Sequence, residues 1–143
     1  MTATTHAYDL TRLAAHAAAS KKGSELVAFD VSQQLGITDV FLIVTCTNER
    51  QVGAVVDAVE EQLLAQGVKA LRREGGRENR WVLLDYNDVV VHVQHEEERR
   101  LYALERLWRD CPRLDLAGIE VPVDQASSVG SAPGLLEGER PGA

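Results

Sequence analysis

Cysteine is scarce in this sequence, and long apolar runs are absent. Only Cys46 and Cys111 occur, with no Cys-x-x-C spacing, whereas a disulfide framework or a structural zinc site needs several clustered ligands. We therefore expect neither. No apolar run approaches the roughly 20 residues that span a bilayer. The first residues also lack the charged start and apolar stretch of a secretory signal, so we expect a cytoplasmic protein.

An excess of basic residues is also missing. The chain carries 15 Lys and Arg against 22 Asp and Glu, a formal net charge of −7. Proteins that bind nucleic acid through its phosphates need a basic surface, so little direct nucleic-acid binding is expected. An acidic body suits a basic protein partner, because complementary charge speeds and orients docking. Mild acidity also keeps a protein soluble, and composition does not separate these two explanations.

The residues that could support catalysis do not form a recognisable site. Cys46 precedes a predicted helix, but no positioned base accompanies it. Gly75 and Gly76 lack the spacing of either phosphate-binding glycine motif. His92 and His95 are three apart on a predicted strand, which places them on opposite faces. The sequence therefore predicts no catalytic residue, no cofactor and no metal site, and it favours an interaction module over an enzyme.

Hydrophobic periodicity predicts an α/β fold with the element order αββαβββα. The continuously apolar run 40–44 is typical of a central strand buried on both faces, and such a strand needs helices on both sides of a mixed sheet of about five strands. We expect one domain over residues 1–120 and a disordered tail over 121–143, which is rich in Pro, Gly and Ser. The predicted helices are 9–20, capped by Asp9 and ended at Gly23; 48–66, capped by Asn48; and one from 96 toward Pro112 with a buried stripe of Leu101, Leu104, Leu107 and Trp108. The predicted strands are 26–31, 40–44, 68–72, 81–86 and 89–94.

The last two strands are predicted to form a β-hairpin. Asn87 and Asp88 suit a tight two-residue turn, and the turn sets the register of the flanking strands. Because strand side chains alternate, six apolar side chains then share one face, which we predict to be the core: Val82, Leu84, Tyr86, Val89, Val91 and Val93. The opposite face carries Trp81, Leu83, Asp85, Val90, His92 and Gln94.

That second face mixes a tryptophan, aliphatic side chains, a carboxylate and an imidazole. Such a mixture is poor for a core and good for an interface, because Trp is enriched among binding hot spots. We therefore predict an exposed docking patch. The alternative is that a helix of the same domain covers this face.

The motifs around this hairpin closely resemble those of the ribosomal silencing factor family, also called the Iojap family. They comprise 81–86, 88–93, 97–99 and 102–108, together with 28–32, 38–41 and 47–52, so the resemblance spans roughly residues 7–110. An ordered series of motifs over that length is far more specific than one motif.

The resemblance implies a nucleotidyltransferase-like fold without the enzymatic activity, since no Asp-x-Asp follows 45–48 in this chain. It also implies binding to the large ribosomal subunit through its protein uL14, which would block subunit joining and repress translation under nutrient limitation. The alternatives are a nucleotide-handling enzyme on the same fold and a homodimer when free. From the exposed face and the family motif together we predict seven partner-binding residues: Trp81, Leu83, Asp85, Tyr86, His92, Glu97 and Arg99.

Overall fold

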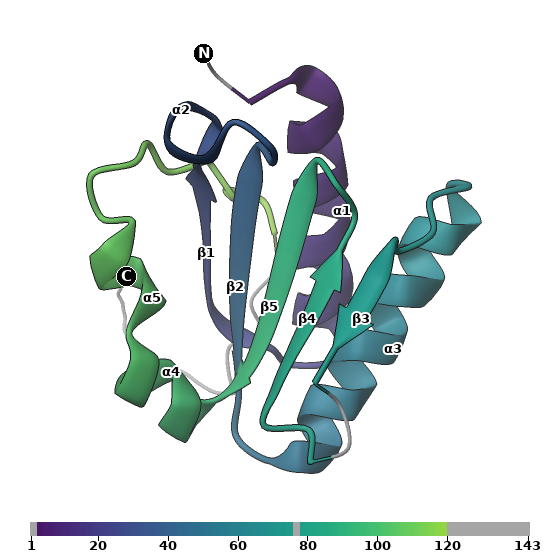
Figure 1. Ribbon diagram of the computed structural model, residues 1–143. Coiled ribbons are helices and arrows are strands. Elements are labelled where there is room, and N and C mark those ends of the chain that lie inside the picture. Colours follow the sequence, from purple (N-terminus) through teal and green to yellow (C-terminus); the bar gives the residue numbers. More distant parts are fainter. Residues whose placement is uncertain (1–2, 76–77, 120–143) are drawn as a thin grey trace.

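A computed structural model describes residues 3–75 and 78–119 (Figure 1). The predicted tail, 121–143, lies outside the described residues. Within them, no helix is long and apolar enough to cross a membrane. The helices are α1 (Thr5–Ser20), α2 (Ser32–Leu35), α3 (Glu49–Ala65), α4 (Glu96–Tyr102) and α5 (Leu104–Leu107), and the strands are β1 (Ser24–Asp30), β2 (Val40–Cys46), β3 (Arg72–Glu74), β4 (Trp81–Asp85) and β5 (Val89–His95).

The strands form one mixed sheet in the order β1-β2-β5-β4-β3. The pair β2–β5 is parallel and the other neighbours are antiparallel. The predicted fold class, a mixed five-stranded sheet with flanking helices, is confirmed. Two details of the predicted order differ: the one-turn helix α2 replaces a turn, and the last helix is divided into α4 and α5.

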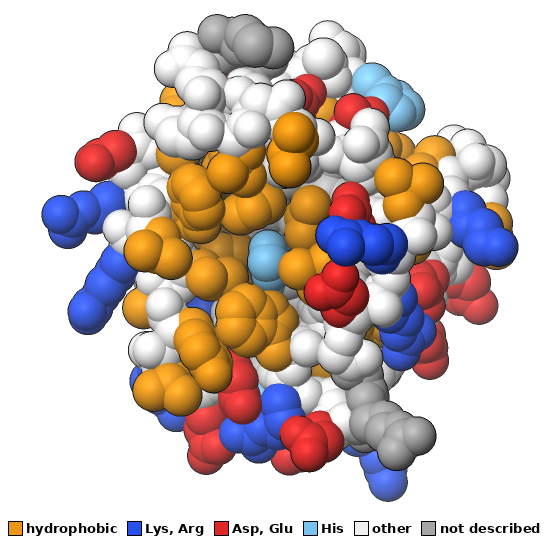
Figure 2. All heavy atoms as spheres, in the orientation of Figure 1, with side chains coloured by type: hydrophobic (Ala, Val, Ile, Leu, Met, Phe, Trp, Pro, Cys, Tyr) orange, Lys and Arg blue, Asp and Glu red, His pale blue; other side chains and the backbone are white. Residues whose placement is uncertain are grey.

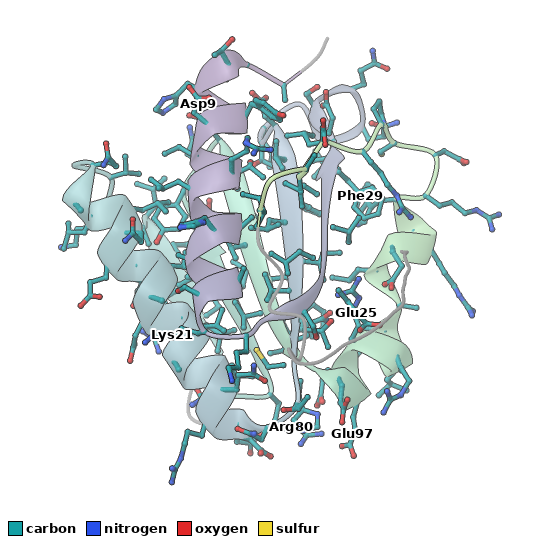
Figure 3. The ribbon with its side chains drawn as sticks, turned by 180° about the vertical axis from the view of Figure 1, so that it is seen from behind. Asp9, Lys21, Glu25, Phe29, Arg80 and Glu97 are labelled. Carbon is teal, nitrogen blue, oxygen red and sulfur yellow. The ribbon has the colours of Figure 1, made fainter. Side chains whose placement is uncertain are left out.

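Helices α1 and α3 cover one face of the sheet (Figure 3). The main core lies between them, and the six apolar side chains predicted for the inner face of the hairpin are all buried in it. The hairpin register is also confirmed, because Leu84 pairs with Val91 and Val82 with Val93. At the turn, the backbone N–H of Tyr86 donates to the carbonyl oxygen of Val89 (2.9 Å).

The other face of the sheet is only partly covered. Helices α4 and α5 lie over the β1–β2 side (Figure 1), where a second cluster forms around Phe29, Val31, Ile43 and Cys111. Leu104 and Trp108 pack against that cluster. The β4–β5 side lies beyond these two short helices, and its outward side chains therefore form much of the surface of this face.

The first helix ends at Ser20 as predicted, but it begins earlier, and the predicted residues at its two caps are wrong. Thr4, not Asp9, is the N-cap, because its side chain accepts the N–H of Ala7 (3.0 Å). At the other end Lys22 takes the left-handed conformation (φ 67°), rather than Gly23. Gly23 is required for a different reason: a Cβ there would stand 2.6 Å from Cγ1 of Val44, so only glycine lets this connection pass over β2.

The strand predicted at 68–72 begins later and is shorter. Strand β3 spans Arg72–Glu74, pairs only with β4 and is exposed at the edge of the sheet. Residues 68–71 instead follow the end of α3, where the N–H of Val68 bonds back to the carbonyl of Leu63 (2.9 Å). Within 68–71, Val68 and Ala70 pack against the main core beside the helix end and do not form a strand.

The predicted buried stripe of the last helix is half wrong. Ala103 takes the left-handed conformation (φ 45°) and separates α4 from α5. A continuous helix would align all four stripe residues, but the break turns two of them outward. Leu101 is 75% exposed and Leu107 is 70% exposed, so these side chains belong to the surface.

Candidate functional site: an aromatic patch on the open sheet face

Five aromatic rings form a continuous row across the partly covered face. The ring centroids of Trp81 and Tyr102 lie 4.9 Å apart, and those of Trp81 and His92 lie 6.0 Å apart. The row continues from His92 to Phe41 (5.0 Å) and from Phe41 to Trp108 (5.3 Å). Figure 2 shows hydrophobic side chains gathered on this face around the row. We call these five residues the aromatic row.

Exposed aliphatic side chains also occur on the elements that carry or adjoin the aromatic row. Ile37, in the loop after α2, is 83% exposed, and Leu101 and Leu107 project from α4 and α5. Leu83 is half-buried beside His92 in the sheet. A contiguous apolar surface of this kind on a small domain marks an interaction site. We call the aromatic row together with Ile37, Leu83, Leu101 and Leu107 the open-face patch.

His92 sits at the centre of the aromatic row and is neutral. The Trp81 indole N–H donates to Nδ1 of His92 (3.2 Å), so Nδ1 carries no proton. Burial lowers the pKa of His92 to about 4, because an imidazolium is poorly solvated there. A neutral imidazole has one ring proton, and it is therefore on Nε2.

The depressed pKa of His92 predicts a pH-dependent stability. The unfolded chain binds this proton near pH 6.5, whereas the folded protein binds it near pH 4. The contribution is fully present above pH 6.5 and is lost as pH falls toward 4, a change of about 3 kcal/mol. Between those pH values, the free energy of unfolding of wild type should fall more steeply than that of His92→Gln. Denaturant titrations of both proteins measure this, and parallel curves would contradict it.

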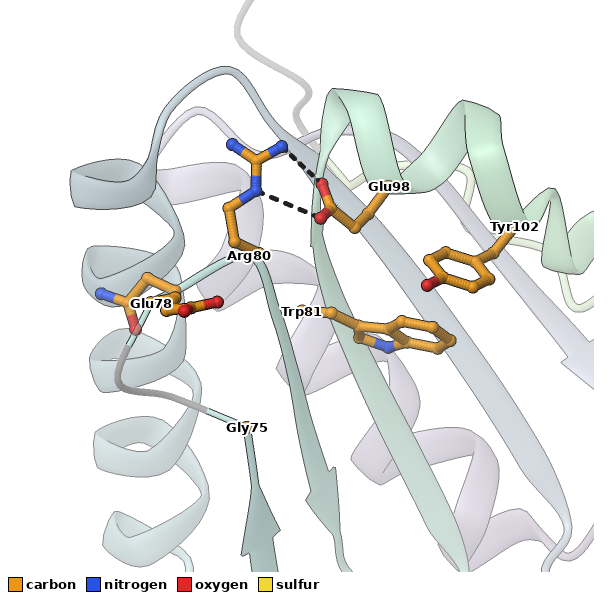
Figure 4. Close-up of a pocket in the computed structure, with 7 residues that line it drawn as sticks. Gly75, Glu78, Arg80, Trp81, Glu98 and Tyr102 are labelled. Carbon is orange, nitrogen blue, oxygen red and sulfur yellow. Dashed lines mark hydrogen bonds and ion pairs between the residues drawn. The ribbon is translucent and has the colours of Figure 1, made fainter.

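A cluster of charges borders the open-face patch at the Trp81 end. The Arg80 guanidinium bonds to Glu97, to Glu98 (Nε to Oε2, 3.1 Å) and to Glu49 (Nη1 to Oε2, 3.0 Å). Figure 4 shows the contact with Glu98. These contacts raise the pKa of Arg80 and lower the pKa of Glu97. The pKa of Glu49 is lowered mainly by a hydrogen bond from its own backbone N–H and further by Arg80. Three carboxylates around one guanidinium leave this corner with a net negative charge.

The same corner holds the set of described residues that comes nearest to a metal site. His95, Glu97 and Glu98 bring ligand atoms within 4.8 Å of one another. However, Nδ1 of His95 accepts the backbone N–H of Glu97 (3.1 Å), and Arg80 already pairs with both carboxylates. The guanidinium of Arg80 therefore already supplies the positive charge that these two carboxylates would offer to a metal ion.

The structure separates two predicted site residues that we expected to lie together. Asp85 lies beside the hairpin turn, where it accepts the N–H of Asn87 (2.8 Å) and pairs with Arg72 (3.2 Å). Glu97 follows the far end of β5. The whole hairpin lies between them, so these two predicted partner-binding residues do not form one acidic edge.

Three further residues do not contribute an exposed side chain to this face. Tyr86 is buried in the main core on the opposite face. Arg99 is buried and donates to the carbonyl of Glu25 (2.9 Å), to Oγ1 of Thr45 and to Glu105 (3.0 Å). Gln94, which we expected on the docking face, is completely buried beside Trp81. Arg99 thus fixes α4 and α5 against β1 and β2, and thereby positions Tyr102.

Six members of the open-face patch were not predicted from the sequence. Four were assigned to buried elements, namely Phe41, Leu101, Leu107 and Trp108, and Ile37 and Tyr102 were not assigned to the site. The parallel pairing of β2 with β5 sets Phe41 beside Val90 and next to His92, and sequence alone does not give that strand order. Tyr102 and Trp108 lay within the family motif, which was the one available signal.

Comparison of the sequence with known proteins identifies a matching family. Residues 4–133 match the family described as "Ribosomal silencing factor during starvation". The chain is 40% identical over 111 residues to the ribosomal silencing factor of Halalkalibacterium halodurans, covering 78% of this chain and 95% of that protein. It is 38% identical over 107 residues to that of Bacillus subtilis, covering 75% and 91%.

Structural comparison agrees with the sequence match. A crystal structure of a protein from Chromobacterium violaceum superposes with a TM-score of 0.69 at 31% identity, covering 78% of this chain and 92% of the other. A more distant mouse relative, 26% identical over 87 residues, covers 59% of this chain and 38% of that protein. It is named "Mitochondrial assembly of ribosomal large subunit protein 1". The match over most of the chain, on a confirmed mixed sheet, means that the chain belongs to the ribosomal silencing factor family.

Proposed function

We propose that this protein binds the large ribosomal subunit through ribosomal protein uL14, using the open-face patch. Bound there, it blocks joining of the small subunit and lowers translation when nutrients are limiting. The action is steric and involves no catalysis. The family match supports the ribosomal role, and the name of the mouse relative supports the choice of the large subunit.

The observation that carries this proposal is the surface itself. Tyr102 is 52% exposed and stacks against Trp81, and Leu101 and Leu107, on the same pair of short helices α4 and α5, are largely exposed. Aromatic anchors with surrounding aliphatic side chains are the composition of a protein–protein interface core. Nothing in the described part of the chain covers these side chains, so a partner protein is the natural cover.

Charge supports a basic partner. The three glutamates that pair with Arg80 form a negatively charged corner. One of them, Glu98, lies near Trp81 and Tyr102 (Figure 4). Ribosomal proteins usually carry excess Lys and Arg because they sit among RNA phosphates. The same negative charge repels bare RNA, which favours docking on a protein surface of the subunit.

Sedimentation with isolated ribosomal subunits tests the proposal. The protein should pellet with purified large subunits and remain in the supernatant with small subunits. Adding it to large subunits before small subunits should reduce the amount of joined ribosome in proportion to occupancy. Pelleting with small subunits only, or joining that proceeds normally on saturated large subunits, would refute the mechanism.

Reversing one charge in the corner around Arg80 should slow docking. Glu97 is largely exposed, with 63% of its side chain accessible, so Glu97→Lys should perturb the fold little. It should reduce the association rate several-fold, and more than Glu97→Ala does, because it adds repulsion to a lost attraction. Raising the salt concentration should shrink the difference.

Surface-immobilised large subunits give these rates directly. Glu61→Lys is the matched control, since Glu61 is an exposed glutamate on α3, behind the sheet. Equal association rates for Glu97→Lys and Glu61→Lys would show that net charge, and not this corner, governs the encounter.

A further inference from the structure

The break between α4 and α5 turns Leu101 and Leu107 toward the surface. The ladder of helical hydrogen bonds stops where the N–H of Ala103 donates to the carbonyl of Arg99 (3.0 Å), and it resumes with the N–H of Arg106 and the carbonyl of Ala103 (2.9 Å). Between these two bonds Ala103 takes the left-handed conformation (φ 45°). Without the break, both leucines would lie on the buried side of one amphipathic helix, as their spacing in the sequence predicts.

Local preference does not explain this break. Residues 96–108 contain neither glycine nor proline, and most of them are Glu, Arg, Leu or Ala, which favour a helix. A left-handed alanine is also strained, because its Cβ approaches the following carbonyl oxygen. The segment taken alone therefore prefers one continuous helix, and a contact elsewhere in the fold must oppose that preference.

The ion pair of Arg99 and Glu105 is such a contact. Nε of Arg99 donates to Oε2 of Glu105 (3.0 Å) across the break. In a continuous α-helix, residues six apart are separated by about 9 Å along the axis and by about 120° around it. Only residues three or four apart face each other there. The geometry of this pair thus requires a helix that is broken between its two members.

Arg99 is held from a second direction by the sheet. Its Nη1 donates to the carbonyl oxygen of Glu25 in β1 (2.9 Å) and to Oγ1 of Thr45 in β2, and its side chain is only 8% exposed. The other oxygen of Glu105, Oε1, is buried without a hydrogen-bond partner in the described part of the chain. The guanidinium is therefore a fixed, buried cation, and the carboxylate of α5 is drawn to it because an unpaired buried charge is costly.

We propose that Arg99 and Glu105 are positioning residues for the docking surface. Their pair holds the break at Ala103, and the break presents Leu101 and Leu107 to the partner, which neither charged side chain touches. The inference rests on the proposed function, and it gives Arg99, which we predicted to bind the partner, an indirect role. Loss of the pair lets α4 and α5 approach one continuous helix, which withdraws both leucines from the open-face patch.

Glu105→Ala tests this, with the same substitution at Glu61 as the matched control. Glu61 is an exposed glutamate on α3, behind the sheet. Glu105→Ala should weaken binding to large subunits about tenfold, because two apolar contacts are lost, whereas Glu61→Ala should leave binding unchanged. In Glu105→Ala, the backbone NMR signals of residues 101–107 should move toward helical values, a change that a general loss of stability does not produce.

A second substitution, Ala103→Gly, should rescue Glu105→Ala. Glycine takes the left-handed conformation without strain and disfavours a helix interior, so it re-forms the break without the ion pair. It does not replace the missing carboxylate, and the buried guanidinium stays unpaired. Both the single and the double variant should therefore melt below wild type, but the double variant should recover most of the affinity. Affinity then follows the break and not the melting temperature.

Ala103→Val closes the break with the ion pair intact, and it decides the matter if Glu105→Ala does not fold. A β-branched residue is a severe outlier in the left-handed region, so valine favours the continuous helix. This variant should bind large subunits several-fold more weakly than wild type, with the same movement of the signals of residues 101–107 toward helical values.

The outcomes separate this inference from the proposed function. If Glu105→Ala and Ala103→Val bind normally while Trp81→Ala does not bind, docking does not need the break, and only the inference is overturned. If Trp81→Ala also binds normally, the open face is not the dock and both proposals fall. An affinity loss in Glu105→Ala that Ala103→Gly does not restore would show that Glu105 contacts the partner itself, and would overturn the positioning role.

Discussion

Trp81→Ala is expected to abolish detectable sedimentation with large subunits while leaving the domain folded. Trp81 is half-buried and contacts Tyr102 and His92 on the open face, so it can stack on a partner without supporting the main core. Truncating a tryptophan at a hot spot costs about 2–4 kcal/mol, which weakens binding about 30- to 1000-fold.

Leu64→Ala is the matched control for Trp81→Ala. Leu64 is 60% exposed but lies on α3, outside the open-face patch, so its loss should leave binding unchanged. Circular dichroism melting of both variants should give curves close to wild type. If Trp81→Ala unfolds the domain, or if the two variants bind equally well, Trp81 is not a docking anchor.

Leu84→Ala should lower the free energy of unfolding by about 2–5 kcal/mol. Leu84 is completely buried between the sheet and the helices behind it, and the smaller side chain leaves a cavity that a paired strand closes only in part. Denaturant titration measures the loss. The fraction of protein that remains folded should bind large subunits with wild-type affinity, because Leu84 faces away from the patch.

Substitution of the adjacent residue, Leu83, should affect mainly binding and not stability. Leu83 is half-buried on the open face and belongs to the open-face patch, so Leu83→Ala should reduce binding more than stability. The two variants differ by one position in one strand and report on the two faces separately. A Leu84→Ala protein that is stable but does not bind would show that the two faces are assigned the wrong way round.

The hairpin could be predicted because short-range rules determine it. Alternation and a two-residue turn fixed which side chains share a face, and the pairing of Leu84 with Val91 confirms this. The same alternation already placed Tyr86 on the core side, so including it among the docking residues contradicted the pattern. Likewise, Asp85 at the turn and Glu97 beyond the last strand are at opposite ends of any hairpin with this register.

The remaining parts of the site depend on contacts between distant segments and on a helix break that no sequence motif predicts. Phe41 meets His92 because β2 and β5 are parallel neighbours, and periodicity says nothing about the order of strands in a sheet. Glycine and proline are the usual sequence signals of a helix end, and neither occurs at the break at Ala103. An alanine in the left-handed region is held there by tertiary contacts, among them the buried Arg99 on one side and the packing of Leu104 on the other.

The position of β5 has a consequence for how this chain folds. It is the last strand in the described part of the sequence, yet it forms hydrogen bonds with both β2 and β4 at the middle of the sheet. A nascent chain that ends before residue 89 therefore holds two half-sheets, each with an open edge where its neighbour belongs. Pairings between distant segments slow folding and expose such edges to aggregation. Closure of the sheet, and with it the cooperative transition, must await synthesis of the strand that joins the two halves.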